Sequence, residues 1–118
     1  MNWYLTKIIF NIVSGAGNHT PQFDEQLRLI LAEDMHTAFE KAKMLGSKEE
    51  ASFLNQHKQK VTWKFVNVAE LYPLPDIKDG IEVYSQTHEP DDLQPYINLV
   101  ERKASSIKTK IMFQSVII

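Results

Sequence analysis

The sequence contains no cysteine among its 118 residues. This absence excludes disulfide bonds, catalysis by a thiolate, and zinc or iron–sulfur sites with thiolate ligands. The sequence also lacks an excess of positive charge, because its formal net charge is -2. No overall positive field therefore draws the chain to nucleic acid or to an anionic membrane. We expect neither of these among its partners.

Long apolar runs are absent as well, since none approaches the roughly 20 residues with which a helix crosses a bilayer. The first residues, Met1–Leu5, carry no basic segment followed by an apolar run, so no signal peptide is expected. Together with the lack of cysteine, this pattern predicts a cytoplasmic protein of bacterial type. The length suits one domain that buries a core of its own, and we predict a single domain over residues 1–118.

Two strands are predicted before the first helix. Residues 3–13 are rich in β-branched and aromatic side chains on both faces, which is typical of a central strand. Residues 14–22 contain turn-forming glycine, asparagine and proline, and they join the two strands as a long hairpin. Residues 23–32 alternate between two faces. We expect the buried face to carry the large apolar side chains Phe23, Leu27, Leu29 and Leu31.

The apolar spacing changes to three and four residues after Asp34, which predicts a helix over residues 35–45 capped by Asp34. Gly46 has the character of a helix stop, and Ser47–Glu50 resembles a capping box that restarts a helix to about Asn55. One helix kinked at Gly46 and two separate helices both fit this pattern. We favour a long, interrupted helical segment.

The second half of the chain predicts two more strands and a helix. Residues 61–71 alternate with a strongly aromatic face, and residues 81–86 form a shorter strand after a proline-containing loop. An apolar stripe then predicts a helix from Leu93 to Ile107. The apolar end of the chain, residues 109–118, is expected to be an extra strand or a packed tail.

These elements predict an α+β fold with an antiparallel sheet of four or five strands. Their order is strand, strand, helix, strand, strand, helix, and the simplest packing places both helices on one face of the sheet. Five large apolar side chains are expected to meet in the core between helices and sheet: Phe39, Trp63, Phe65, Ile97 and Val100.

Several stretches are distinctive when they are taken together: Trp3–Leu5, Gly17–Arg28, Trp63–Val68 with Glu70–Tyr72, and Asp79–Ser85. In these stretches the sequence resembles a family of small bacterial proteins known as domain of unknown function 4288. The resemblance runs from Trp3 to about Asp92, and the loop from Gly17 to Arg28 is its most distinctive part. It implies a small cytoplasmic α+β domain, and it supplies no activity, cofactor or catalytic residue.

Polar side chains at two places form the candidate binding site. The loop before the second strand, together with the start of that strand, carries His19, Thr20, Gln22, Asp24 and Arg28, and the predicted strand 81–86 adds Glu82 and Tyr84. Histidine and carboxylates can bind a divalent metal or transfer protons. Their spacing here matches no known ligand signature, so we predict no metal site and no cofactor. The favoured interpretation is that His19 and Thr20 bond to nearby backbone groups.

The sequence leaves two hypotheses about function. The first is a non-catalytic binding or protein-interaction module that forms a homodimer, because two helical stripes cannot cover both faces of the sheet and the apolar tail. A monomer whose tail forms a fifth strand is the alternative assembly. The second hypothesis is a small enzyme or ligand-binding protein that uses the loop from Gly15 to Arg28 with Glu82 and Tyr84. An unidentified protein or a small molecule would be the partner.

Overall fold

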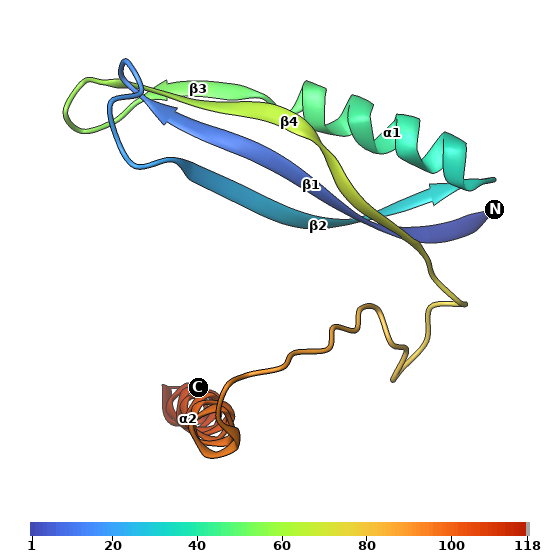
Figure 1. Ribbon diagram of the computed structural model, residues 1–118, viewed down its shortest axis with the longest axis vertical. Coiled ribbons are helices and arrows are strands. Elements are labelled where there is room, and N and C mark those ends of the chain that lie inside the picture. The colour runs from blue at the N-terminus through green and yellow to red at the C-terminus, as the bar shows by residue number, and fades with distance from the viewer. Residues whose placement is uncertain (118) are drawn as a thin grey trace. The chain divides into compact units, whose positions relative to one another are not determined.

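The computed structural model describes residues 1–117, and contacts within the chain divide it into two units after Val83 (Figure 1). The first unit contains β1 (Asn2–Ser14), β2 (Gln22–Ala32), α1 (Met35–Lys48), β3 (Ala51–Leu54) and β4 (Lys60–Pro73). The second unit contains α2 (Leu93–Ile117). The α+β class and the four-stranded antiparallel sheet are thus confirmed.

The sheet has the strand order β2-β1-β4-β3, and each neighbouring pair is antiparallel. The prediction that the first strand is central is correct, because β1 lies between β2 and β4. β1 and β2 form the expected hairpin, with Leu5 opposite Leu29. β4 joins the other edge of β1, although 45 residues separate the two strands in the sequence (residues 15–59).

The pairing of β1 with β4 is interrupted at two places. The register shifts between Lys7 and Ile8, and again between Ile9 and Phe10, so that Val66 and Ala69 of β4 have no opposite residue on β1. Each shift moves the alternation of β4 by one residue. As a result, the core-facing side chains of β4 do not follow one strict period of two: Trp63, Phe65, Val68 and Leu71.

The hydrophobic core lies between α1 and one face of the sheet, which we call the inner face. β1 contributes the fully buried Ile8 and Phe10, and α1 contributes the small side chains of Ala38 and Ala42. The small residues let the helix lie close to the strands, and the ring of Phe10 meets the ring of Phe65 edge-on at 5.9 Å between centroids. The aromatic contribution of β4 to the core, from Trp63 and Phe65, is confirmed.

Asp34 begins α1 as its sequence position indicates. Its side-chain oxygen Oδ1 accepts a hydrogen bond from the backbone N–H of Thr37 at 2.7 Å, which satisfies one free donor of the first turn. The hydrogen bonds from Thr37 hold the pKa of Asp34 below its ordinary value of 3.8. The ionised carboxylate therefore stabilises the folded state.

Replacing Asp34 by alanine is expected to lower the melting temperature at neutral pH. Asp34→Asn should retain most of the stability that the cap supplies, because the amide oxygen accepts the same bond. Since the folded-state pKa of Asp34 is depressed, its ionic contribution is present above the ordinary pKa of 3.8 and is lost as the pH falls through the lower, folded-state pKa. Thermal melts at neutral pH and near pH 2 measure this effect. The loss of stability on acidification should be smaller for Asp34→Asn than for the wild type, and an Asp34→Ala variant as stable as the wild type at neutral pH would refute the cap.

The prediction for residues 46–55 is wrong. Gly46 is a buried residue inside α1, and the helix continues to Lys48 before residues 51–54 form β3 beside β4. An added Cβ on Gly46 would lie 2.9 Å from Cζ of Phe65 and closer still to Cδ1 and Cε1. Gly46 is therefore needed for the close approach of Phe65 and does not end the helix.

The predictions for the last third of the chain are also corrected. Residues 81–86, all within the described range, form no strand, so the second half of the predicted order does not hold residue for residue. The expected tail strand is instead the end of α2 as far as residue 117, and residue 118 lies outside the described residues. Ile97 and Val100 belong to the second unit and are exposed, so they are not part of the core beneath α1.

Candidate functional site

The loop between β1 and β2 is held together by His19. Its ring atom Nε2 accepts a hydrogen bond from the backbone N–H of Ser14 at 3.0 Å, and Nδ1 lies 2.8 Å from the carbonyl oxygen of Thr20. Both bonds form together when the neutral ring carries its proton on Nδ1. The side chain of His19 therefore bonds to backbone groups, as the favoured interpretation of the sequence has it, whereas Thr20 contributes its backbone carbonyl.

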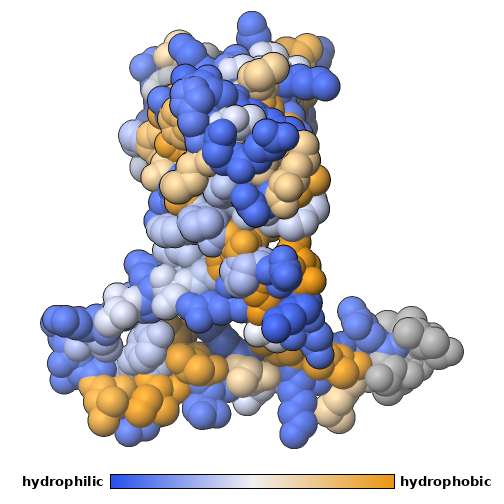
Figure 2. Space-filling view, turned by 90° about the vertical axis from the view of Figure 1, so that its right-hand side faces the viewer, coloured by the Kyte–Doolittle hydropathy of each residue, from blue (hydrophilic) through white to orange (hydrophobic). Residues whose placement is uncertain are grey.

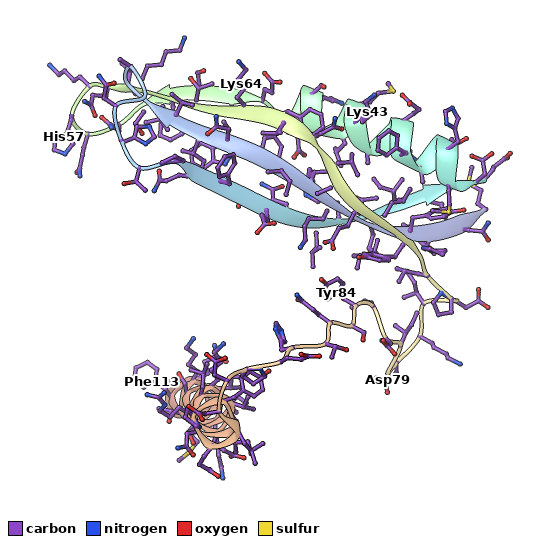
Figure 3. All side chains as sticks on the ribbon, in the orientation of Figure 1. Lys43, His57, Lys64, Asp79, Tyr84 and Phe113 are labelled. Carbon is purple, nitrogen blue, oxygen red and sulfur yellow. The ribbon has the colours of Figure 1, made fainter. Side chains whose placement is uncertain are left out.

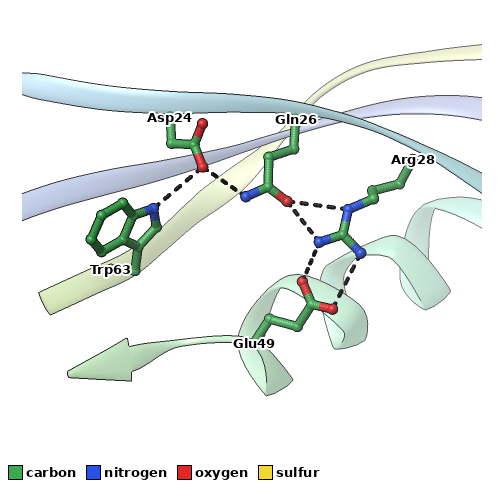
Figure 4. Close-up of polar contacts among 5 residues, drawn as sticks. All are labelled: Asp24, Gln26, Arg28, Glu49 and Trp63. Atoms are coloured by element: carbon green, nitrogen blue, oxygen red, sulfur yellow. Dashed lines mark hydrogen bonds and ion pairs between the residues drawn. The ribbon is translucent and has the colours of Figure 1, made fainter. Parts of the chain in front are cut away.

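Asp24 starts a row of polar side chains on the inner face of β2 (Figure 4). Its atom Oδ2 accepts hydrogen bonds from Nε2 of Gln26 at 2.7 Å and from Nε1 of Trp63 on β4 at 3.3 Å. Gln26 in turn accepts from Arg28, with its Oε1 lying 2.7 Å from Nη2 and 3.1 Å from Nε. The alternation of a strand places these three residues on one face.

Arg28 extends this row to the end of α1. Its two terminal nitrogens, Nη1 and Nη2, donate to the carboxylate of Glu49, with Nη1 lying 3.2 Å from Oε1. Glu49 is the residue that caps the C-terminus of α1. The row therefore joins β4, β2 and α1 on the part of the inner face that lies beyond the helix (Figure 4). Every charged group in the row has a partner, so the row serves to hold these three elements together. We call the row, which consists of Trp63, Asp24, Gln26, Arg28 and Glu49, the brace.

The other predicted site residues do not join this row. Gln22 is exposed at the first position of β2, and Glu82 lies on the irregular segment that follows β4. Tyr84, labelled in Figure 3, belongs to the second unit. Its hydroxyl donates to Oε1 of Gln86 at 3.5 Å. Among the predicted site residues, the structure thus brings Asp24 and Arg28 together through Gln26, and His19 together with Thr20.

The opposite face of β2 contradicts the expected burial of its apolar residues. Phe23, Leu27 and Leu29 are 57%, 53% and 49% exposed, whereas Ile30 on the inner face is 5% exposed. α1 covers the inner face, so the side chains that alternate with Ile30 point away from the helix. We call the uncovered side the outer face and define its apolar part by Trp3, Phe23, Leu27, Leu29 and Tyr72.

The outer face also carries a polar centre. Lys7 of β1 lies 2.8 Å from Oε2 of Glu70 on β4 and 3.9 Å from Oε1 of Glu25 on β2. The hydroxyl of Tyr72 donates to the other oxygen of Glu70 at 2.9 Å. The bond from Lys7, and next that from Tyr72, hold the pKa of Glu70 below its ordinary value. An ionised pair with defined partners therefore lies within an apolar surface.

Sequence reasoning missed both the brace and the outer face. The alternation of Asp24, Gln26 and Arg28 was a usable signal for a polar row along one strand face. No local signal revealed Glu49 as the partner of Arg28, because the two residues are joined only by the fold. The apolar face of β2 gave a misleading signal, since it has the composition of a buried face and is not covered by α1.

No group of three or more histidine, aspartate or glutamate side chains that could hold a metal ion occurs among the residues the structure describes. No helix in the same part of the chain has the length and apolarity needed to cross a membrane. The outer face remains as a candidate site in the first unit, and its exposed apolar side chains are suited to contact with another surface.

Comparison with known proteins bears on the first unit. A family model described as "Domain of unknown function (DUF4288)" matches residues 3–85. The match ends within two residues of the division between the two units, so it covers the sheet and α1 and leaves α2 outside. No curated protein and no solved structure matches the chain. The match spans more than half of the sequence, and the chain therefore belongs to the DUF4288 family, whose function is unknown.

Proposed function

We propose that the chain is a non-catalytic protein-interaction module of a bacterial cytoplasmic protein, and that it binds another protein through the outer face of its sheet. One observation carries this proposal, namely the row of exposed apolar side chains on β2 and its neighbours. At about 200 Å² for a whole large side chain, the five apolar residues of the outer face expose roughly 500 Å² together. Patches of this size on a folded domain often mark interaction sites.

The polar centre makes the outer face selective. A partner must offer apolar side chains to Leu27 and Leu29 while it leaves Lys7 and Glu70 paired or replaces their bonds. Breaking a desolvated ion pair without replacement costs binding energy, so partners with the wrong polar pattern are rejected. This combination of an apolar rim and a charged centre favours recognition of a particular protein surface.

The alternative is a ligand site built from the loop residues 15–28 with Glu82 and Tyr84, and it has less support. Both ring nitrogens of His19 are engaged with backbone groups, and Arg28 is bound by Gln26 and Glu49. A small ligand would have to displace these bonds before it could use either residue. The outer face offers contact area without such a cost.

The double substitution Leu27→Ser with Leu29→Ser is expected to change the free energy of unfolding by less than about 1 kcal/mol, because both side chains are about half exposed. It should abolish partner binding, since interface energy is concentrated in a few apolar contacts. The measurement is photocrosslinking in the producing cells, with benzoylphenylalanine in place of Phe23, which is 57% exposed on the same face. A single adduct of defined mass is expected, and it should disappear when the double serine substitution is added.

The matched control places the same photoreactive residue at Met44, which is 72% exposed on α1. That probe should not form the adduct, because it lies on the helix and not on the outer face. Identical adducts from both positions, or a double serine variant that unfolds cooperatively at a much lower temperature, would contradict the proposal. The latter result would mean that the outer face is a covered part of the core.

A further inference from the structure

α2 has the periodicity of a coiled-coil helix. Its apolar residues recur at alternating intervals of four and three positions, which is the a and d pattern of a heptad repeat. The seam defined by this spacing consists of Leu93, Ile97, Val100, Ala104, Ile107 and Ile111. We call these six residues the α2 seam. The pattern covers most of a helix of 25 residues.

The rest of the helix surface is polar through most of the same length. Residues 101–103 are Glu-Arg-Lys, residues 105 and 106 are serines, and residues 108–110 are Lys-Thr-Lys. Polar side chains bond along the helix itself, as Gln94 does to Asn98 at 3.0 Å and Thr109 to the carbonyl of Ser105 at 3.0 Å. α2 therefore has one regular apolar stripe and a mostly polar remainder, which also carries Tyr96, Leu99, Met112 and Phe113. Figure 2 shows apolar side chains along the helix between polar ones.

Within the second unit, α2 is the only helix or strand among the described residues. Its seam is open within that unit: Leu93 is 75% exposed and Ile107 is 58% exposed. A helix of ordinary composition is marginal in water unless its apolar face is packed. The family match ends before α2 begins, so the matched domain does not account for the seam.

We propose that α2 pairs with α2 of a second copy of this chain in a two-stranded coiled coil, which makes the protein a homodimer. The spacing of the seam is the same from either end, so in a symmetric pair each apolar position meets another apolar position. The small side chain of Ala104 near the middle lets the two helices approach. This inference concerns a surface separate from the outer face and does not depend on it.

The contact area is sufficient for a specific dimer. An aliphatic side chain that moves from water into an apolar contact buries roughly 100 Å² at most. The six seam positions then bury about 500 Å² on each helix, or about 1,000 Å² in total, which reaches the lower range of specific interfaces. An interface of this size is expected to have a dissociation constant on the order of micromolar.

The test uses the full chain and places a glutamate inside or beside the seam. Ile107→Glu introduces a charge at a seam position, whereas Ser106→Glu introduces the same charge at the adjacent polar position. Sedimentation equilibrium over micromolar to several hundred micromolar concentrations should give a dimer for the wild type and for Ser106→Glu. Ile107→Glu should raise the dissociation constant at least about 100-fold, because each copy buries an unpaired charge.

Circular dichroism separates loss of pairing from loss of folding. The helical signal of the wild type should rise with protein concentration, and that of Ile107→Glu should not, because an unpaired α2 is marginal. The fluorescence of Trp3 and Trp63, which both lie in the first unit, should be the same in all variants. A full chain that stays monomeric at several hundred micromolar would overturn the inference. A dimer that persists in the Ile107→Glu variant would also overturn the inference. If the double substitution Leu27→Ser with Leu29→Ser then dissociates that dimer, the outer face joins the two copies instead.

Discussion

Replacing Phe10 by alanine is expected to destabilise the protein by about 3–5 kcal/mol, the usual cost of deleting a buried phenyl group. Phe10 is 1% exposed and lies on the central strand, with its ring against the edge of the Phe65 ring. The substitution removes both the transfer of the ring from water and its edge-on contact. Because α1 and β4 both pack here, the cavity cannot be closed by one small movement. Urea unfolding followed by tryptophan fluorescence gives the change in free energy.

Phe23→Ala is the matched control for Phe10, since it deletes the same ring from an adjacent strand of the same sheet. Phe23 is 57% exposed on the outer face, so its loss should cost about 1 kcal/mol or less. The ratio of the two costs reports which face of the sheet is covered. Equal costs for the two substitutions would refute the assignment of inner and outer faces.

Gly46→Ala is expected to destabilise the protein by about 2 kcal/mol, although alanine is the better helix former. The added Cβ would overlap the ring of Phe65, and such overpacking costs about 1–3 kcal/mol or more. The gain in helix propensity recovers only about 1 kcal/mol of this. The same unfolding measurement detects the net loss.

A double-mutant cycle with Phe65→Val identifies the cause. Valine has no δ, ε or ζ carbon, so in the Phe65→Val background the atoms that the added Cβ would meet are gone, and Gly46→Ala should become neutral or stabilising by up to about 1 kcal/mol. The difference between the two backgrounds is the coupling between Gly46 and the Phe65 ring. If Gly46→Ala stabilises the protein with Phe65 intact, the close approach of α1 to β4 is wrong.

Local chemistry was enough to predict the first half of the fold. The β-branched and aromatic residues of β1 indicated a central strand, and Asp34 indicated the start of α1; both predictions are confirmed. The α+β class followed from the change of period after residue 32. These features depend on neighbouring residues in the sequence, which is why the sequence alone contains them.

Features that depend on distant residues were not predictable in this way. Gly46 has the composition of a helix stop, and only the position of Phe65 explains its place inside α1. β3 is four residues long and exposed, so its alternation is too short to compete with a helical pattern. In the candidate site, the bonds of His19 were anticipated, whereas the partnership of Arg28 with Glu49 depends on how α1 ends against β2.

The exposure of the outer face was hidden for a related reason. A row of leucines on a strand indicates an apolar face, but it does not say which element covers that face. The helix of the first unit, α1, covers the side of Ile30. The sequence therefore identified the two faces of β2 and assigned burial to the wrong one.

The place of β4 beside β1 has a consequence for the order in which the chain folds during synthesis. β1, β2 and α1 leave the ribosome first and can form a hairpin with a helix on it, because their contacts are local. The second edge of β1 stays unpaired until β4, which ends at Pro73, has been synthesised. Phe10 can contact its partner Phe65 only after 55 further residues have been added to the chain. During this interval the central strand of the finished sheet is an unpaired edge, the kind of edge at which chains aggregate. We therefore expect the docking of β4 to limit the folding rate, and we expect slow translation between residues 33 and 73 to prolong the stage at which chaperones capture the nascent chain.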